Sequence, residues 1–150
     1  MKNTFWKRER IEIMTALALF NYVFLGAEYL FDNMMAFQTD SGGVVLAQSY
    51  VLGSSTVGFL LFGVLDGKMR ERAKKAGSAG AGVLAAVCLW GIQVHQSYGS
   101  TLAAGLILYV LLGIAGSLVH YRVACRYGME EHLAETVGVS YATGLFLQFL

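Results

Sequence analysis

The sequence predicts an all-α fold, a polytopic membrane helix bundle with about five transmembrane helices. Of the 150 residues, 56% are hydrophobic and only 14% are charged, whereas a soluble domain carries about 25% charged residues. The charges are also bunched, which leaves long segments between them almost uncharged. Helices of a soluble bundle need a polar face, and these segments lack one. The composition therefore favours lipid as the surrounding solvent.

Four segments reach or nearly reach the length of a membrane span. A helix needs roughly 20 apolar residues to cross the hydrocarbon core, and its backbone groups must bond within the segment, so helices rather than single strands are expected. A fifth apolar stretch, 136–150, has only 15 residues. We therefore expect residues 1–150 to form a single transmembrane helical domain that is truncated in its fifth span. The four longer segments are 13–31, 43–65, 76–94 and 100–119.

The Lys and Arg residues indicate the orientation of these spans. Basic residues are enriched at the cytoplasmic ends of membrane helices. With the N-terminus in the cytoplasm, all 11 Lys and Arg fall on that side, and the loops after the first and third segments carry none. We expect a multi-pass protein of the inner cell membrane with a cytoplasmic N-terminus. The cations are Lys2, Lys7, Arg8, Arg10, Lys68, Arg70, Arg72, Lys74, Lys75, Arg122 and Arg126.

The sequence carries no motif that indicates an enzyme. It contains no phosphate-binding loop, nucleophile elbow or dinucleotide fingerprint, and its three His residues show no metal-ligand spacing. Cys88 and Cys125 fall in different segments, and no disulfide is expected on the reducing side of the membrane. The basic stretch 68–75 lies between two spans, where setting the orientation explains it better than nucleic-acid binding. We therefore expect no catalysis, cofactor, metal or bound nucleic acid.

Polar side chains inside the first two segments are the candidates for a functional site. Asn21, Glu28 and Asp32 share one face of the first segment because they are spaced by seven and four residues. Ionisable residues inside a span usually face a cavity or a partner. One interpretation is that these residues, with Gln48 of the second segment, line a pathway for substrate or protons. The other is that Glu28 is simply hydrated at the outer edge of the membrane.

Small residues predict where the helices touch. The second segment carries Ser49 and Gly53 four residues apart, and then Ser54 and Gly58 at the same spacing. Small residues at this spacing allow helix backbones to approach closely in membranes. Gly53 and Gly58 are therefore predicted packing positions.

Two stretches carry a resemblance to a known family. The loop GVLDGKMRER places Gly63, Asp66, Arg70 and Arg72 between the second and third spans. It resembles the signature loop of the major facilitator superfamily, in which Gly, Asp and spaced cations join these spans. The stretch YVLLGIAGS from Tyr109 is similar to the family's fourth-helix pattern. Gly113 and Gly116 fit that pattern as packing positions, whereas Tyr109 stands where the family usually has a buried Arg.

The resemblance implies the first five helices of a six-helix half, which packs against a second half of the same chain. Transporters of this kind bind substrate near the membrane midplane between the halves. The signature loop would act as an inner gate through Gly63, Asp66, Arg70 and Arg72. The alternative, that these charges only set the orientation, stays open.

Two functions remain from the sequence. The first is part of a secondary transporter that moves an unidentified small solute by alternating access, with the bilayer and the remainder of the same chain as partners. The alternative is a transporter-like membrane sensor domain of a bacterial helix-turn-helix regulator, which does not transport. A small self-assembling membrane protein is a third interpretation.

Overall fold

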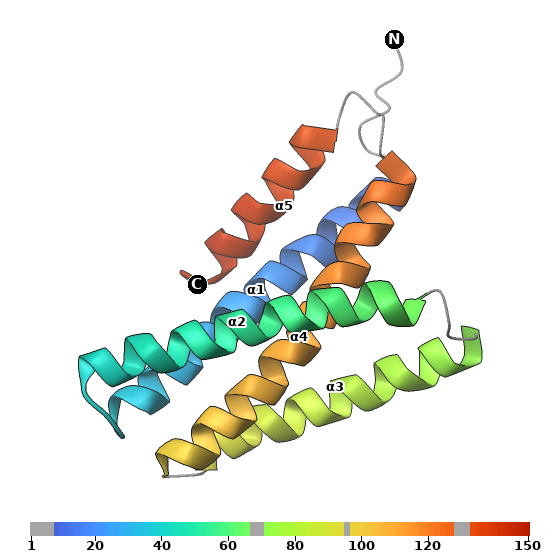
Figure 1. The fold of residues 1–150 in the computed structure, drawn as a ribbon. Helices are drawn as coiled ribbons and strands as arrows, with labels where there is room; N and C mark the ends of the chain where they lie inside the picture. Colours follow the sequence, from blue (N-terminus) through green and yellow to red (C-terminus); the bar gives the residue numbers. More distant parts are fainter. Residues whose placement is uncertain (1–7, 67–70, 95–96, 128–132) are drawn as a thin grey trace. The chain divides into compact units, whose positions relative to one another are not determined.

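The described part of the chain is entirely helical. The computed structural model describes residues 8–66, 71–94, 97–127 and 133–150, and no strand occurs among them (Figure 1). This confirms the all-α prediction. The helices are α1 (Arg8–Ala36), α2 (Ser41–Asp66), α3 (Glu71–Val94), α4 (Tyr98–Tyr127) and α5 (Leu133–Leu147).

Three of the helices are long and apolar enough to cross a membrane. Arg10–Ala36, Ser41–Leu65 and Tyr98–Cys125 have mean hydropathies of 1.4, 1.5 and 2.3 over their most apolar stretches. Gly80–Val94 and Leu133–Leu147 are apolar but shorter. The α5 helix has 15 residues, a length of about 22 Å against a hydrocarbon core of about 30 Å. The helices thus indicate a membrane protein with three spans of full length.

The turn between α1 and α2 explains where α2 begins. Asp40 precedes the helix, and its Oδ1 accepts a hydrogen bond of 2.8 Å from the backbone N–H of Gly43. Its carbonyl accepts the bond from Val44 N at 3.0 Å. A side-chain oxygen that satisfies an N–H in the first turn is the pattern of a helix N-cap. Because this connection is short, the start of α2 returns along the end of α1.

The chain divides into two compact units. The first unit comprises Met1–Gly26 and Leu118–Leu150, and the second comprises Ala27–Ser117. The α1 and α4 helices continue through the two boundaries, so each unit takes a part of both helices. The first unit adds α5 to these parts, and the second adds α2 and α3.

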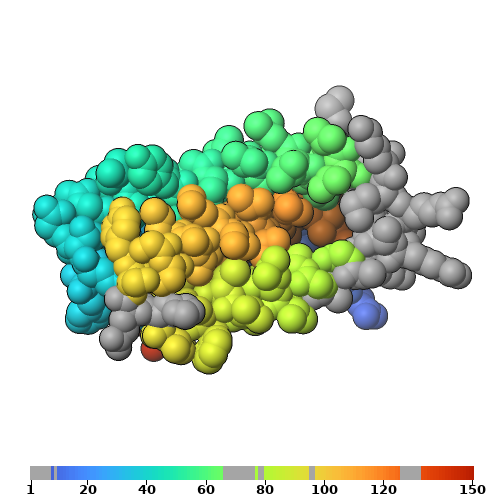
Figure 2. Space-filling model, turned by 60° about the horizontal axis from the view of Figure 1, so that its bottom comes forward, coloured from blue at the N-terminus to red at the C-terminus, as the bar shows by residue number. Residues whose placement is uncertain are grey.

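In the second unit, α1, α2 and α4 share a core of buried side chains. The ring of Phe31 in α1 lies edge-on to the ring of Tyr109 in α4, with centroids 6.5 Å apart. Both side chains are fully buried. The α3 helix buries Cys88 and Ile92 and lies beside α4 in Figures 1 and 2. The other buried side chains of this unit are Ala27, Met35, Ala47, Val51, Ser55, Thr101, Leu108 and Leu112.

The closest helix contact of the second unit joins α2 to α4. A Cβ added to Gly58 would lie 3.0 Å from the Cα of Gly113 and would overlap the carbonyl oxygen of Val110. Figure 2 shows α2 lying along α4. Ser54 Oγ donates a hydrogen bond of 3.1 Å to the carbonyl of Leu106 in the same contact. Glycine is required on both helices because backbone atoms of one helix occupy the space of a Cβ on the other.

The other two predicted packing glycines differ from each other. Gly116 is buried on α4. Gly53 is exposed on α2, and a Cβ there would meet nothing within 4 Å. Gly53 therefore takes no part in a helix contact among the described residues.

In the first unit, α5 packs a stripe of small residues against α1. Thr136, Ser140 and Gly144 are the buried residues of α5, and their spacing of four places them on one face. A Cβ on Gly144 would lie 2.8 Å from Asn21 Cβ and 2.9 Å from the carbonyl oxygen of Ala18. This stripe produces the close α1–α5 contact.

Candidate functional site

Three of the predicted site residues lie together in the second unit. Glu28 and Asp32 project from α1, one helical turn apart, and Gln48 projects from α2. Gln48 Nε2 lies 2.8 Å from Glu28 Oε1 and 3.0 Å from Asp32 Oδ2. We call these three half-buried side chains the acidic cluster.

The helix hairpin brings the acidic cluster together. Glu28 and Asp32 precede the turn by a few residues, and Gln48 follows it by a similar number. The two carboxylates share a face of α1 because they are four residues apart. Gln48 is next to Ala47, which is fully buried, so Gln48 lies at the edge of the α2 face that packs in the core. The amide thus reaches both carboxylates from across the α1–α2 contact.

The acidic cluster has two acids and one neutral donor. The amide nitrogen of Gln48 has two N–H groups, and each carboxylate accepts one bond. Neither carboxylate forms an ion pair within the described ranges. Asp32 Oδ1 is enclosed by protein and accepts no hydrogen bond there. Two carboxylates without a cationic partner among the described residues concentrate negative charge, so the arrangement is suited to bind a cation.

Tyr109 adds a third helix to the surroundings of the acidic cluster. Its side chain is fully buried in α4, it contacts Phe31, and it lies near both Glu28 and Asp32. The sequence analysis singled out Tyr109 only as a departure from a family pattern. The family that the chain resembles usually has a buried Arg at this position. The replacement of that Arg by Tyr was the only feature of the sequence that drew attention to it.

Asn21 lies in the first unit, against α5. It is buried on α1, and its Cβ faces Gly144. Its Nδ2 is enclosed and donates no hydrogen bond to any described residue. The structure therefore places Asn21 in a helix contact, whereas Glu28, Asp32 and Gln48 form the acidic cluster.

The predicted gate residues lie mostly outside the described side chains. Gly63 is exposed near the end of α2, with nothing within 4 Å of an added Cβ. Asp66 ends α2 and Arg72 falls in the first turn of α3, but their side chains are outside the description, as is the whole of Arg70. The gate stays a prediction.

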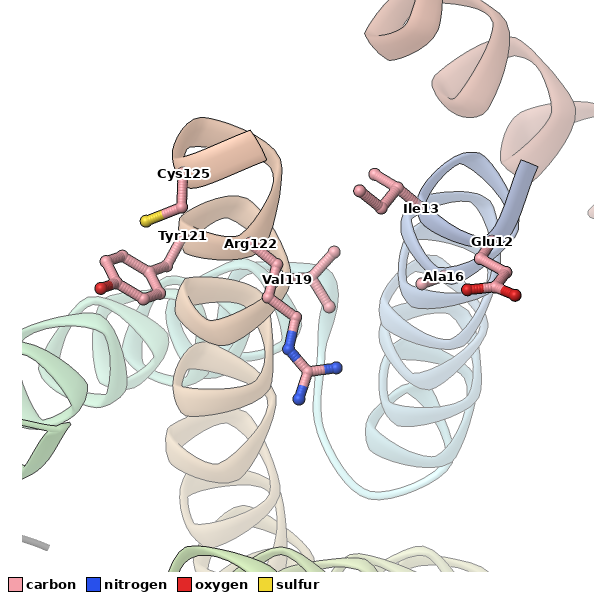
Figure 3. A pocket seen from close by; sticks show the side chains of 7 residues that line it. All are labelled: Glu12, Ile13, Ala16, Val119, Tyr121, Arg122 and Cys125. Atoms are coloured by element: carbon pink, nitrogen blue, oxygen red, sulfur yellow. The ribbon is translucent and has the colours of Figure 1, made fainter. Parts of the chain in front are cut away.

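A cavity of about 420 Å³ lies in the first unit, between the first turns of α1 and the last turns of α4. Figure 3 shows Arg122 and Val119 of α4 and Ile13 of α1 pointing into the space between these helices. The sequence analysis did not predict it, because nothing in the sequence indicates which faces of α1 and α4 meet. Its lining residues are Glu12, Ile13, Ala16, Val119, Tyr121, Arg122 and Cys125.

No metal-binding group of three His, Cys, Asp or Glu residues occurs in the part of the chain that the structure describes.

Comparison with known proteins does not identify a family for this chain. No protein-family model matches the chain, and no curated protein or solved structure matches it either. The resemblance to the major facilitator superfamily therefore rests on the two quoted stretches.

Proposed function

We propose that this chain is part of a secondary transporter of the inner membrane, and that the acidic cluster binds the transported or coupling cation. The observation that carries the proposal is the bridging of two carboxylates by one amide, at 2.8 and 3.0 Å. A neutral amide positions the acids without neutralising them. We infer that a bound proton or cationic solute supplies the positive charge that the described residues do not.

The location of the acidic cluster supports this role. Ionisable side chains inside a membrane span are costly and usually line a cavity or a pathway. Glu28 and Asp32 belong to a stretch of α1 that is long and apolar enough to span the bilayer. They lie toward the end of this helix that the distribution of Lys and Arg assigns to the outside. A cation entering from outside would meet these acids first.

The proposal retains the arrangement implied by the family resemblance. The α1, α2 and α4 helices supply the polar and aromatic groups of the site, and a second half of the chain would close its open side. The shorter apolar helices α3 and α5 would complete five spans of the first half. Asp66, Arg70 and Arg72 would form the inner gate in this arrangement.

Flux measurements on proteoliposomes test this function. The chain, extended by any natural sequence that follows residue 150, is reconstituted with a pH-sensitive dye inside, and a pH gradient is imposed. Tetraethylammonium, a cation that crosses a lipid bilayer poorly by itself, serves as the probe cation, and protein-free liposomes give the background rate. We expect the probe to dissipate the gradient with the wild-type protein, and Asp32→Ala to reduce the rate at least tenfold.

Asn33→Ala is the matched control. Asn33 is adjacent to Asp32 on α1, but it is exposed and donates its side-chain hydrogen bond to the carbonyl of Tyr29. Truncation there should leave the rate within twofold of wild type. Equal rates for the two Ala variants would remove the acidic cluster from the function. Probe binding without any flux would favour the sensor alternative over transport.

A further inference from the structure

The cavity of the first unit has a feature that the proposed function does not use, an inward-pointing cation. Arg122 extends from α4 into the space beside α1 (Figure 3), and it forms no ion pair within the described ranges. The one acid that lines the cavity, Glu12, pairs with Arg8 at 3.1 Å. Among the described lining residues, Arg122 is therefore the charged side chain without a counter-ion.

The remainder of the wall nearest Arg122 is apolar. Ile13 and Ala16 of α1 and Val119 of α4 line the cavity beside the guanidinium group. A volume of about 420 Å³ falls at the smaller end of the range for ligand pockets, which is roughly 300–1,000 Å³. A ligand that satisfies this wall needs an anionic group for Arg122 and an apolar part beside it.

The level of the cavity in the membrane identifies a source for such a ligand. The first turns of α1 and the last turns of α4 are ends of two candidate spans, and both carry basic residues that are expected to be cytoplasmic. Basic pockets between membrane helices on this side bind anionic lipid head groups. An arginine fork also suits the oxygens of a phosphate.

We propose that this cavity binds an anionic phospholipid of the inner leaflet, with its phosphate on Arg122 and the start of its acyl chains against Ile13, Ala16 and Val119. The first unit would thereby carry a lipid site separate from the acidic cluster of the second unit. Its test does not depend on transport.

Native mass spectrometry of the detergent-solubilised whole chain measures this binding directly. The protein is titrated with phosphatidylglycerol, with phosphatidylcholine and with soluble glycerol 3-phosphate. We expect one saturable phosphatidylglycerol per chain, weaker binding of phosphatidylcholine, and no retained glycerol 3-phosphate. Arg122→Gln should lower the affinity for phosphatidylglycerol at least about fivefold, the effect of one interfacial cation.

Two further variants separate the cavity from general surface charge. Lys2→Gln removes a cation that is expected on the same side of the membrane and is not among the described lining residues, and it should change the affinity less than twofold. Ala16→Leu keeps Arg122 but fills the apolar wall at an exposed position, and it should also weaken the lipid.

The outcomes that overturn the lipid site are specific. Equal losses of affinity for Arg122→Gln and Lys2→Gln would mean that general surface charge, and not the cavity, attracts the lipid. Equal affinities for phosphatidylcholine and phosphatidylglycerol would show that the cavity does not distinguish an anionic lipid from a zwitterionic one. Tight binding of glycerol 3-phosphate would make the site one for a free phosphate. If Arg122→Gln does not fold, an unchanged affinity of Ala16→Leu for phosphatidylglycerol would be enough to refute the proposal.

Discussion

Asn21 in the first unit and Gln48 in the second are both amide side chains in apolar helices, but their surroundings differ. Gln48 donates to two carboxylates across the α1–α2 contact. Asn21 is more deeply buried, and its amide nitrogen has no acceptor among the described residues. Enclosed polar groups are usually hydrogen-bonded because an unmet donor is costly. The comparison indicates that the amide nitrogen of Gln48 is matched to two acceptors, whereas that of Asn21 is enclosed in a helix contact without an acceptor among the described residues.

The close helix contacts of the two units also differ in the atoms that meet each glycine. In the second unit glycine meets glycine, so that backbone faces backbone at Gly58 and Gly113. In the first unit Gly144 meets the side chain of Asn21 as well as the backbone of Ala18. An added Cβ would overlap a backbone carbonyl oxygen at Gly58 and at Gly113, whereas at Gly144 its nearest neighbour would lie 2.8 Å away. The α2–α4 contact should therefore tolerate substitution least.

The largest effect is expected for Gly58→Val. The added side chain would meet the backbone of α4 at Val110, Gly113 and Ile114, and those atoms cannot move aside separately. Overpacking of this kind costs about 3 kcal/mol. Unfolding by SDS in mixed micelles, followed by circular dichroism, measures the free energy of unfolding.

Gly53→Val is the matched control on the same helix. Nothing lies within 4 Å of a Cβ at Gly53, so the change should stay within about 0.5 kcal/mol of wild type, as for most surface substitutions. If both valine variants lost the same free energy, the α2–α4 contact would not be the feature that glycine serves.

An intermediate effect is expected for Gln48→Leu. This change removes the donor of both carboxylates and leaves two acids without a partner among the described side chains. An unsatisfied enclosed polar group costs about 2 kcal/mol. The same SDS unfolding assay measures the loss.

A second substitution tests whether that loss comes from the acids. Adding Asp32→Asn supplies a new amide and removes one charge, so the double variant should recover about 1 kcal/mol relative to additivity. Strictly additive losses would mean that Gln48 and Asp32 do not interact.

The smallest effect, and one of opposite sign, is expected for Asn21→Leu. Replacing an enclosed amide whose nitrogen has no acceptor with an apolar group of similar shape should raise the free energy of unfolding by about 1 kcal/mol. Asn21→Ala serves as the comparison, because it removes the amide but leaves a void. A large destabilisation by leucine would show that the Asn21 amide is engaged, and lost flux in this variant would place Asn21 in the pathway.

Several features could be predicted from the sequence, but the partners within the site could not. The spacing of Glu28 and Asp32 places them on one helical face wherever the helix sits. Gln48 of the second segment was predicted to share a pathway with these acids, but only the rotation of α2 against α1 shows that its amide lies against both carboxylates. Gly53 and Gly58 likewise have equivalent small partners four residues before them. The spacing alone does not indicate whether Gly53 or Gly58 packs against another helix.

The long charge-free segments were enough to predict a helical protein of membrane character, since a chain in lipid must satisfy its own backbone groups. The sequence also showed that all the cations gather in the segments expected on one side. Three features became visible only in the folded chain: the contact of Gly58 with Gly113, the amide of Gln48 between two acids, and the cavity that Arg122 enters. Each feature depends on which faces of two helices pack together. That choice is made by contacts between residues far apart in the sequence, which the periodicity of a single segment does not encode.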